Sequence, residues 1–211
     1  MTLNLRALLA VTGCLTALLT PPWVAADTLS DLQNHWAVAN YETSGKAKEA
    51  AFASLLSEAE AALQAQPQDA EILIWSGIVH SSYAGVKGGL GALKFAKLAR
   101  KELEQALSIN AGALHGSAYT SLGTLYAKVP GWPIGFGNKD KAAELLRQAL
   151  AINPDGIDPN YFYGEFLLEQ GDQTQARRYL LKARQAPARP GREVADKGRQ
   201  AEISALLDSL D

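Results

Sequence analysis

The segment from residue 157 to residue 190 reads IDPNYFYGEFLLEQGDQTQARRYLLKARQAPARP and sets the pattern for most of the chain. Its apolar residues recur at spacings of three and four, the period of an amphipathic helix, on both sides of a Gly-Asp turn. Small residues (Gly164 in the first half, Ala176 and Ala183 in the second) allow two antiparallel helices to approach closely. The segment therefore predicts a helix–turn–helix unit in which Gly164 faces Ala176 and Ala183.

The same pattern recurs along the chain. Helix-ending stretches repeat a small or bulky apolar residue followed three positions later by Ala, and end at Pro or an equivalent residue. They are 59–67 (AEAALQAQP), 103–111 (LEQALSINA), 146–154 (LRQALAINP) and 180–187 (LLKARQAP). A small residue also occurs in the preceding helix, at Gly77 and Gly123 as at Gly164. No sustained strand-like alternation is present, so the sequence indicates an all-α protein built from repeats.

These residues resemble the tetratricopeptide repeat (TPR), a helix–turn–helix unit of about 34 residues. The resemblance implies an all-α, right-handed TPR-like α-solenoid of about four helical hairpins plus a C-terminal capping helix. No single unit can bury its apolar face alone, so the units must stack. We expect repeats at about 32–67, 70–111, 113–154 and 157–190, and a capping helix at 193–210 with its polar face outward.

The N-terminus reads as an export segment. A basic start at Arg6 precedes an apolar run from Ala7 to Thr20, and small residues follow up to Ala26. This order is typical of a secretory signal peptide, and the run is shorter than the roughly 20 residues of a permanent membrane span. We expect a signal peptide at 1–26, a TPR-like domain at 27–211 and a periplasmic location. Alternatively, the residues before Cys14 resemble a lipobox, which would make the chain a membrane-anchored lipoprotein.

The composition limits the kinds of chemistry and of binding partner that the protein is expected to have. Cys14 is the only cysteine, so the exported domain would have neither a disulfide nor thiolate chemistry. The formal net charge of −2 gives no indication of nucleic-acid binding. Contact with a membrane is expected only if Cys14 is lipidated.

Two units carry insertions, and both are rich in glycine. One covers 83–91 and the other 128–138, which reads KVPGWPIGFGN. Both fall at the turn between paired helices, so they should form neighbouring loops at one edge of the solenoid. Trp132 and Phe136 either pack onto adjacent helices and fill gaps, or present aromatic surface to a ligand or partner. Loops on a rigid scaffold often carry function, so both residues are candidates for partner or ligand binding.

A second candidate surface lies on the first helix of the fourth unit. Glu165 and Glu169 are four residues apart and share a face, and Tyr161 lies one turn earlier. We expect these three residues on the exposed, concave side, binding a polar or basic segment of a partner. The alternatives are an ordinary solvated face or, less simply, an acid–base pair.

The chain shows little sign of catalytic chemistry. His35, His80 and His115 lie far apart without a metal-ligand pattern, and His80 occupies a core-facing position. No nucleophile elbow or phosphate loop is recognisable. We therefore predict a protein that is not an enzyme and that has no cofactor, no metal site and no catalytic residues.

Two functions remain open. The first is a non-catalytic periplasmic TPR scaffold that binds a protein or peptide partner of the cell envelope through its concave face and inter-helix loops. The second follows from a resemblance to TatT-type components of TRAP transporters, carried by PGWPIGFGNKDKA (130–142), NPDGIDPNYFYGEFLLEQGD (153–172) and ARPGREVADKGR (188–199). That resemblance implies a transport accessory that binds a small apolar or acidic ligand and a substrate-binding protein.

Overall fold

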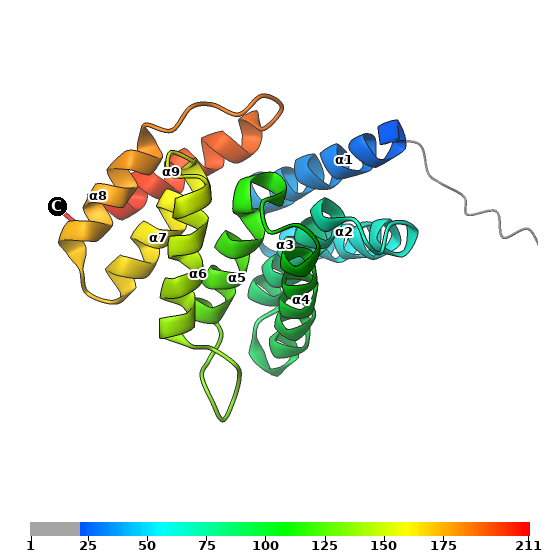
Figure 1. The fold of residues 1–211 in the computed structure, drawn as a ribbon, viewed down its shortest axis with the longest axis horizontal. Helices are drawn as coiled ribbons and strands as arrows, with labels where there is room; N and C mark the ends of the chain where they lie inside the picture. Colours follow the sequence, from blue (N-terminus) through cyan, green and yellow to red (C-terminus); the bar gives the residue numbers. More distant parts are fainter. Residues whose placement is uncertain (1–21) are drawn as a thin grey trace, which may run out of the picture.

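A computed structural model describes residues 22–211, with side chains from residue 28 onward except that of residue 90. Within this range every named element is a helix (Figure 1). The helices are α1 (Pro22–Tyr41), α2 (Gly45–Ala65), α3 (Ala70–Lys87), α4 (Gly89–Asn110), the short 3-10 helix η1 (Ala113–Gly116), α5 (Ser117–Lys128), α6 (Lys139–Ile152), α7 (Ile157–Glu169), α8 (Gln173–Arg184) and α9 (Glu193–Asp208).

The expected export segment is only partly covered. Cys14 and the apolar run from Ala7 to Thr20 lie outside the described residues, and the expected cleavage point after Ala26 falls within α1. Export and lipidation therefore stay predictions. In the described part of the chain, none of the helices combines the length and apolar character that a bilayer crossing requires.

Successive helices pair into four hairpins, α1–α2, α3–α4, α5–α6 and α7–α8, and these stack in chain order (Figure 1). The second helix of each hairpin packs on the first helix of the next, and α1, α3, α5 and α7 also contact one another in sequence. The all-α solenoid predicted from the sequence is confirmed.

The glycines of the repeat allow close helix pairing. In three hairpins, a β-carbon added to the first-helix glycine would lie 2.7–3.0 Å from Cγ of a buried leucine on the second helix. The pairs are Gly77–Leu103, Gly123–Leu146 and Gly164–Leu180. Gly164 also lies against the backbone oxygen of Ala176, as the sequence predicted, but its nearest side chain is Leu180 rather than Ala183.

The first insertion does not form a loop, which corrects the sequence prediction. Helix α3 continues to Lys87 and α4 begins at Gly89, so the extra residues lengthen both helices of the hairpin. Within the insertion, only Gly88 and Gly89 have positive φ, at 60° and 61°. Across the lengthened hairpin, Tyr83 packs edge-on against Phe95 at 4.7 Å between ring centroids, which helps to explain why the chain stays helical.

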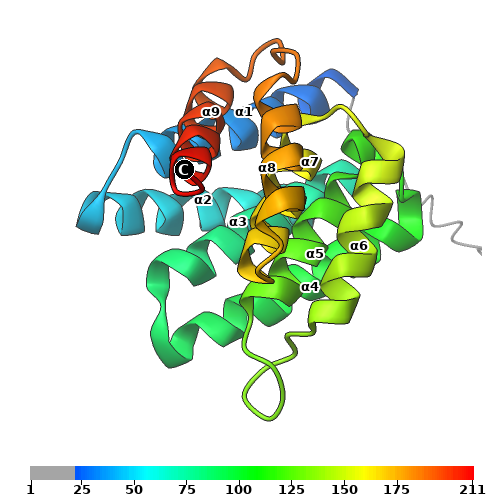
Figure 2. The same cartoon turned by 90° about the vertical axis from the view of Figure 1, so that its left-hand side faces the viewer.

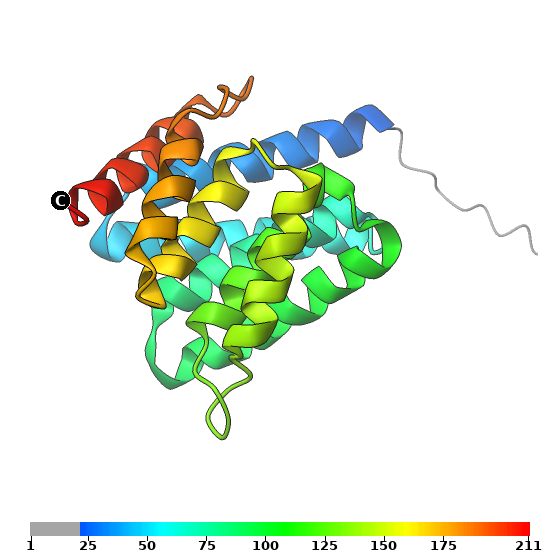
Figure 3. The same cartoon turned by 60° about the vertical axis from the view of Figure 1, so that its left-hand side comes forward.

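The second insertion is a true loop, residues 129–138, which projects from the body (Figure 3). Gly131 and Gly137 form an isolated bridge at its base, and Asn138 caps α6 by accepting the Lys141 backbone N–H. Only glycine fits at 137, because a β-carbon there would lie 1.8 Å from the backbone oxygen of Val129. The loop lies on the same side of the molecule as the α3–α4 turn (Figures 2 and 3).

The last helix does more than cap the stack. Helix α9 packs on α7 and α8 and also on α1, so the two ends of the solenoid meet (Figure 2). The contact is close because Gly198 of α9 lies against the ring of Tyr41, where an added β-carbon would approach the ring atoms to 2.3 Å. The solenoid is therefore closed into a ring rather than left as an open arc.

Candidate functional site

Ring closure produces a central pocket. The first helices of the hairpins, α1, α3, α5 and α7, supply its inner walls, and α9 with the loop before it covers the remaining side. The pocket encloses about 660 Å³, a size within the range of roughly 300–1,000 Å³ that small-molecule sites occupy. The helices that position the site are those that the repeat pattern defines.

Two helices line the central pocket with regularly spaced side chains. From α5 the pocket is lined by four hydroxyl side chains, by Leu125 and, at the end of the helix, by Lys128. From α3 it is lined by a tryptophan, an isoleucine, two serines and a glycine. Spacings of three and four place each set on one helix face. The α3 set is Trp75, Ile78, Ser81, Ser82 and Gly85, and the α5 hydroxyls are Ser117, Thr120, Ser121 and Thr124.

An aromatic corner joins α1 to α3. The Trp36 indole N–H donates to the Ser82 hydroxyl at 2.9 Å. The Trp36 ring meets Trp75 edge-on at 5.9 Å and Tyr41 edge-on at 5.7 Å between centroids. All four side chains line the central pocket, so this corner gives the pocket an aromatic wall whose rings contact one another.

The opposite side of the pocket is charged. Arg199 Nε donates to Asp158 Oδ1 at 3.0 Å, and Arg189 Nη1 donates to Asp158 Oδ2 at 2.5 Å. Burial alone would raise the pKa of the Asp158 carboxyl, but Arg199 and Arg189 outweigh it and the pKa is lowered. Because Asp158 belongs to α7 and both arginines to the α9 region, this carboxylate ties α9 over the pocket.

Acid should loosen this tie. A lowered folded-state pKa means that the ionised Asp158 stabilises the fold above its unfolded pKa of about 3.8, and that the contribution disappears as the pH falls through the folded-state pKa. Asp158→Asn should therefore destabilise the protein at neutral pH, and the difference in free energy of unfolding from the wild type should shrink below about pH 3.8. Urea unfolding across this range measures it.

The control is Asp208→Asn, which removes an exposed carboxylate from α9 without touching the tie to α7. It should leave the unfolding free energy nearly unchanged at every pH in the series. The linkage would be contradicted if the difference in free energy of unfolding between the wild type and Asp158→Asn stayed constant from neutral pH to below pH 3.8.

The two aromatic candidates of the second insertion differ in their surroundings. Trp132 is 89% exposed and Ile134 beside it is 69% exposed. Phe136 is half-buried, edge-on to Tyr126 at 5.5 Å and under the Arg100 guanidinium at 4.7 Å. Phe136 thus anchors the loop to α5 and α4, and Trp132 is free for a partner. Neither lines the central pocket.

The expected exposed row on α7 is not present in that form. Tyr161 is only 6% exposed, because α9 covers it and the Arg199 guanidinium lies 4.3 Å above its ring. The expectation of an exposed Tyr161 is wrong. Glu165 and Glu169 do share a face, but both pair with Lys128 of α5, Glu165 at 3.1 Å and Glu169 more closely. Burial opposes protonation of Lys128, yet the two carboxylates raise its pKa.

The histidines do not assemble a site. His80 is 2% exposed, as its core-facing position predicted, and its Nδ1 lies 2.8 Å from Glu102 Oε2. His35 pairs with Glu58 on the surface of α1 and α2. Within the described part of the chain, no group of three histidine, cysteine or acidic side chains is placed to hold a metal ion.

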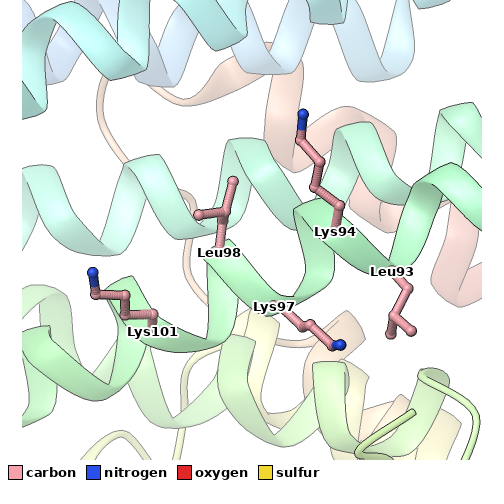
Figure 4. A pocket seen from close by; sticks show the side chains of 5 residues that line it. All are labelled: Leu93, Lys94, Lys97, Leu98 and Lys101. Carbon is pink, nitrogen blue, oxygen red and sulfur yellow. The ribbon is translucent and has the colours of Figure 1, made fainter. Parts of the chain in front are cut away.

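A second depression lies on the surface of α4 (Figure 4). Leu93, Lys94, Lys97, Leu98 and Lys101 line it, all from one helix. Their side chains diverge along the helix rather than converging on a common point. Five residues from a single helix cannot enclose a ligand, so the central pocket is the better candidate site.

Comparison with known proteins agrees with the repeat pattern. A sequence model of the tetratricopeptide repeat matches residues 134–196, which hold α6, α7 and α8. No curated protein sequence matches the chain. Solved structures with a similar outline include MamA (19% identity, TM-score 0.46, 78% of this chain and 90% of that one) and TTC0263, a thermophilic TPR protein of Thermus thermophilus (18%, 0.44, 86% and 99%).

These structural similarities are too low to carry a conclusion about partners or activity. The sequence match is independent of them and falls on the segment whose 34-residue period is visible in the chain itself. The helices that it covers form the hairpin α7–α8 and its neighbours, with the glycine and leucine contacts described above. Residues 134–196 therefore match the tetratricopeptide repeat family.

Proposed function

We propose that the chain is a non-catalytic scaffold of the periplasm that holds a protein partner of the cell envelope. A TPR fold is a protein–protein interaction scaffold in general. Here the observation that carries the proposal is the presence of two surfaces suited to contact: the central pocket on the concave side, and the exposed Trp132 and Ile134 at the tip of the 129–138 loop. The pocket takes a short segment of the partner and the loop contacts its surface.

Rigid presentation supports this role. The loop is anchored by Phe136 and by the bridge between Gly131 and Gly137. Consequently Trp132 is held outward without being part of the core. An aromatic side chain in this setting loses little entropy on binding, and tryptophan is among the residues that dominate interface energies.

Trp132→Ala should separate binding from folding. The side chain is 89% exposed, so the free energy of unfolding should change by less than about 0.5 kcal/mol. Recovery of the partner should fall at least about tenfold, the effect of losing an interface hot spot. Affinity capture from the cell envelope with the tagged chain measures recovery, and thermal melting measures stability.

Ile109→Ala is the matched control, because Ile109 is 42% exposed on α4 away from the loop. It should leave recovery of the same partner unchanged. Equal recovery with the wild type, Trp132→Ala and Ile109→Ala would refute a role for the loop. Mass determination of the mature N-terminus in the same sample distinguishes cleavage after Ala26 from lipidation at Cys14.

The closure of α9 onto α1 favours a second candidate, an accessory protein that encloses a small ligand, as the resemblance to TatT-type transport components implies. A bounded pocket of about 660 Å³ suits a small molecule, whereas an open groove suits an extended peptide. Native mass spectrometry of the protein purified from the periplasm tests this directly. A retained small molecule supports the second candidate, and a co-purified polypeptide supports the first.

A further inference from the structure

Arg192 is a residue of the central pocket whose guanidinium, within the part of the chain that the structure describes, lacks both an ion-pair partner and a hydrogen-bond partner for its Nε. It lies immediately before α9 and lines the pocket, with its guanidinium 4.9 Å from the centre of the Trp75 ring. Its Nε is buried without a hydrogen-bond partner. Among the described residues no carboxylate forms an ion pair with Arg192. A buried donor of this kind costs free energy unless something satisfies it.

The three carboxylates of the charged cluster that joins α7, α9 and α1 are already engaged by other groups. Each makes at least two contacts with arginines, the protein backbone or a tyrosine, and none of these contacts involves Arg192. The three are Asp158, held by Arg189 and Arg199; Asp196, held by the Arg189 side chain and backbone N–H; and Glu202, held by Arg199 and the Tyr41 hydroxyl. No carboxylate of the cluster is left to pair with Arg192.

The electrostatic surroundings point the same way. Burial, together with the neighbouring Arg189, lowers the pKa of the Arg192 guanidinium, and Asp158 and Asp196 offset this only in part. An arginine nevertheless stays protonated in proteins. The protein's own groups therefore leave the charge of Arg192 under-compensated, and a bound anion would compensate it.

The other side chains that line the pocket indicate the chemistry of the rest of the ligand. The face of Trp75 supports the guanidinium, and Trp36 and Ile78 continue the apolar surface from α1 and α3. A planar guanidinium stacked on an indole is preorganised to bind a carboxylate in a bidentate manner. A single unpaired cation, with Asp155 and Asp158 in the same pocket, matches a single negative charge better than a double one.

We propose that Arg192, stacked on Trp75, binds the carboxylate of a monoanionic ligand whose apolar body lies against Trp36 and Ile78. This rests on the proposed function, because it takes the central pocket as the place where the chain binds its partner or ligand. The carboxylate comes either from a free organic acid or from the C-terminus of a peptide. Arg192 lies outside the four hairpins, so the site depends on the closing helix and not on the repeats alone.

The test uses isothermal titration calorimetry of the full chain with two matched pairs of probes. One pair is octanoate and its neutral amide, octanamide. The other is a short peptide ending in leucine, with a free or an amidated C-terminus. Loss of a charge-assisted hydrogen bond costs about tenfold to a hundredfold in affinity, so each acid should bind more tightly than its amide by that factor. This comparison on the unaltered chain does not depend on whether a variant folds.

Arg192→Gln should remove the preference, bringing the acid to the affinity of the amide. Arg184→Gln is the matched control, because Arg184 is exposed on α8 and does not line the pocket; it should bind as the wild type does. Circular dichroism verifies that both variants keep their helices. Preference for octanoate alone identifies a free acid as the source, and preference for the free peptide alone identifies a C-terminus.

Three results would overturn the proposal: acid and amide binding equally, Arg192→Gln keeping the preference, or no binding of either acid. None of them decides the proposed function. A partner that is captured through Trp132 while both acids fail to bind leaves the scaffold standing and removes the carboxylate site. Conversely, acid binding without a captured partner leaves the site and removes the protein scaffold.

Discussion

Replacing Arg199 by methionine should lower the free energy of unfolding by about 3–5 kcal/mol, the cost of breaking a buried ion pair by removing one partner. The Arg199 side chain is 8% exposed. It bridges Asp158 of α7 and Glu202 of α9, and its guanidinium lies 4.3 Å and 4.5 Å from the centres of Tyr161 and Phe162. Methionine keeps the bulk of the side chain, but it leaves Asp158 with one arginine.

Urea unfolding followed by circular dichroism measures this loss, and Arg184→Met is its control. Arg184 is exposed, so its replacement should change the free energy by less than about 0.5 kcal/mol. If Arg199→Met lowered the free energy of unfolding as little as the control does, the ion pairs between α7 and α9 would contribute little to stability. They would then not be the main interaction that holds the ring closed.

Gly198→Ala should destabilise the protein by about 2–3 kcal/mol, toward the upper end of overpacking costs. A β-carbon at this position would lie 2.3 Å from Cγ and Cδ1 of the Tyr41 ring. Because Cγ is attached directly to the tyrosine β-carbon, the whole ring must swing away or α9 must lift from α1. Either movement breaks the hydrogen bond from the Tyr41 hydroxyl to Glu202.

Gly85→Ala is an internal control for the same exchange. No atom lies within 4 Å of an added β-carbon at Gly85, which belongs to α3. There the better helix propensity of alanine should act alone and stabilise the protein by up to about 1 kcal/mol. Thermal or urea unfolding of both variants should give opposite signs. A stabilised Gly198→Ala would contradict the close contact of α1 with α9.

The repeat was predictable because its causes are local. Each of the glycines at 77, 123 and 164 faces a leucine that stands three residues before the alanine of a helix-ending stretch, and each pair is decided within one unit. The first insertion was predicted wrongly because glycine was taken as a sign of a loop. Of the glycines in this insertion, only Gly88 and Gly89 adopt positive φ, and Gly85 and Gly91 lie within the lengthened helices.

The central pocket was not predictable in the same way. It depends on a contact between Tyr41 and Gly198, which are far apart in the sequence. The same closure buries Tyr161. Tyr161 was expected to be exposed because the repeat pattern does not show that α9 covers this part of α7. The sequence held two signals of the contact between α9 and α1. One is the glycine inside α9, because a glycine destabilises a helix and its presence there suggests a close packing contact. The other is the pair of arginines at 192 and 199, seven residues apart on one face.

The central claim is that α9 closes the solenoid onto α1 and so encloses the pocket. Spin labels on Val38 of α1 and Lys197 of α9, both exposed positions, test it in a chain whose Cys14 is replaced by serine. Pulsed electron–electron distance measurement should give one narrow distribution centred on the separation in the closed ring. A broad distribution, or one shifted to the longer distances of an open arc, would contradict the claim.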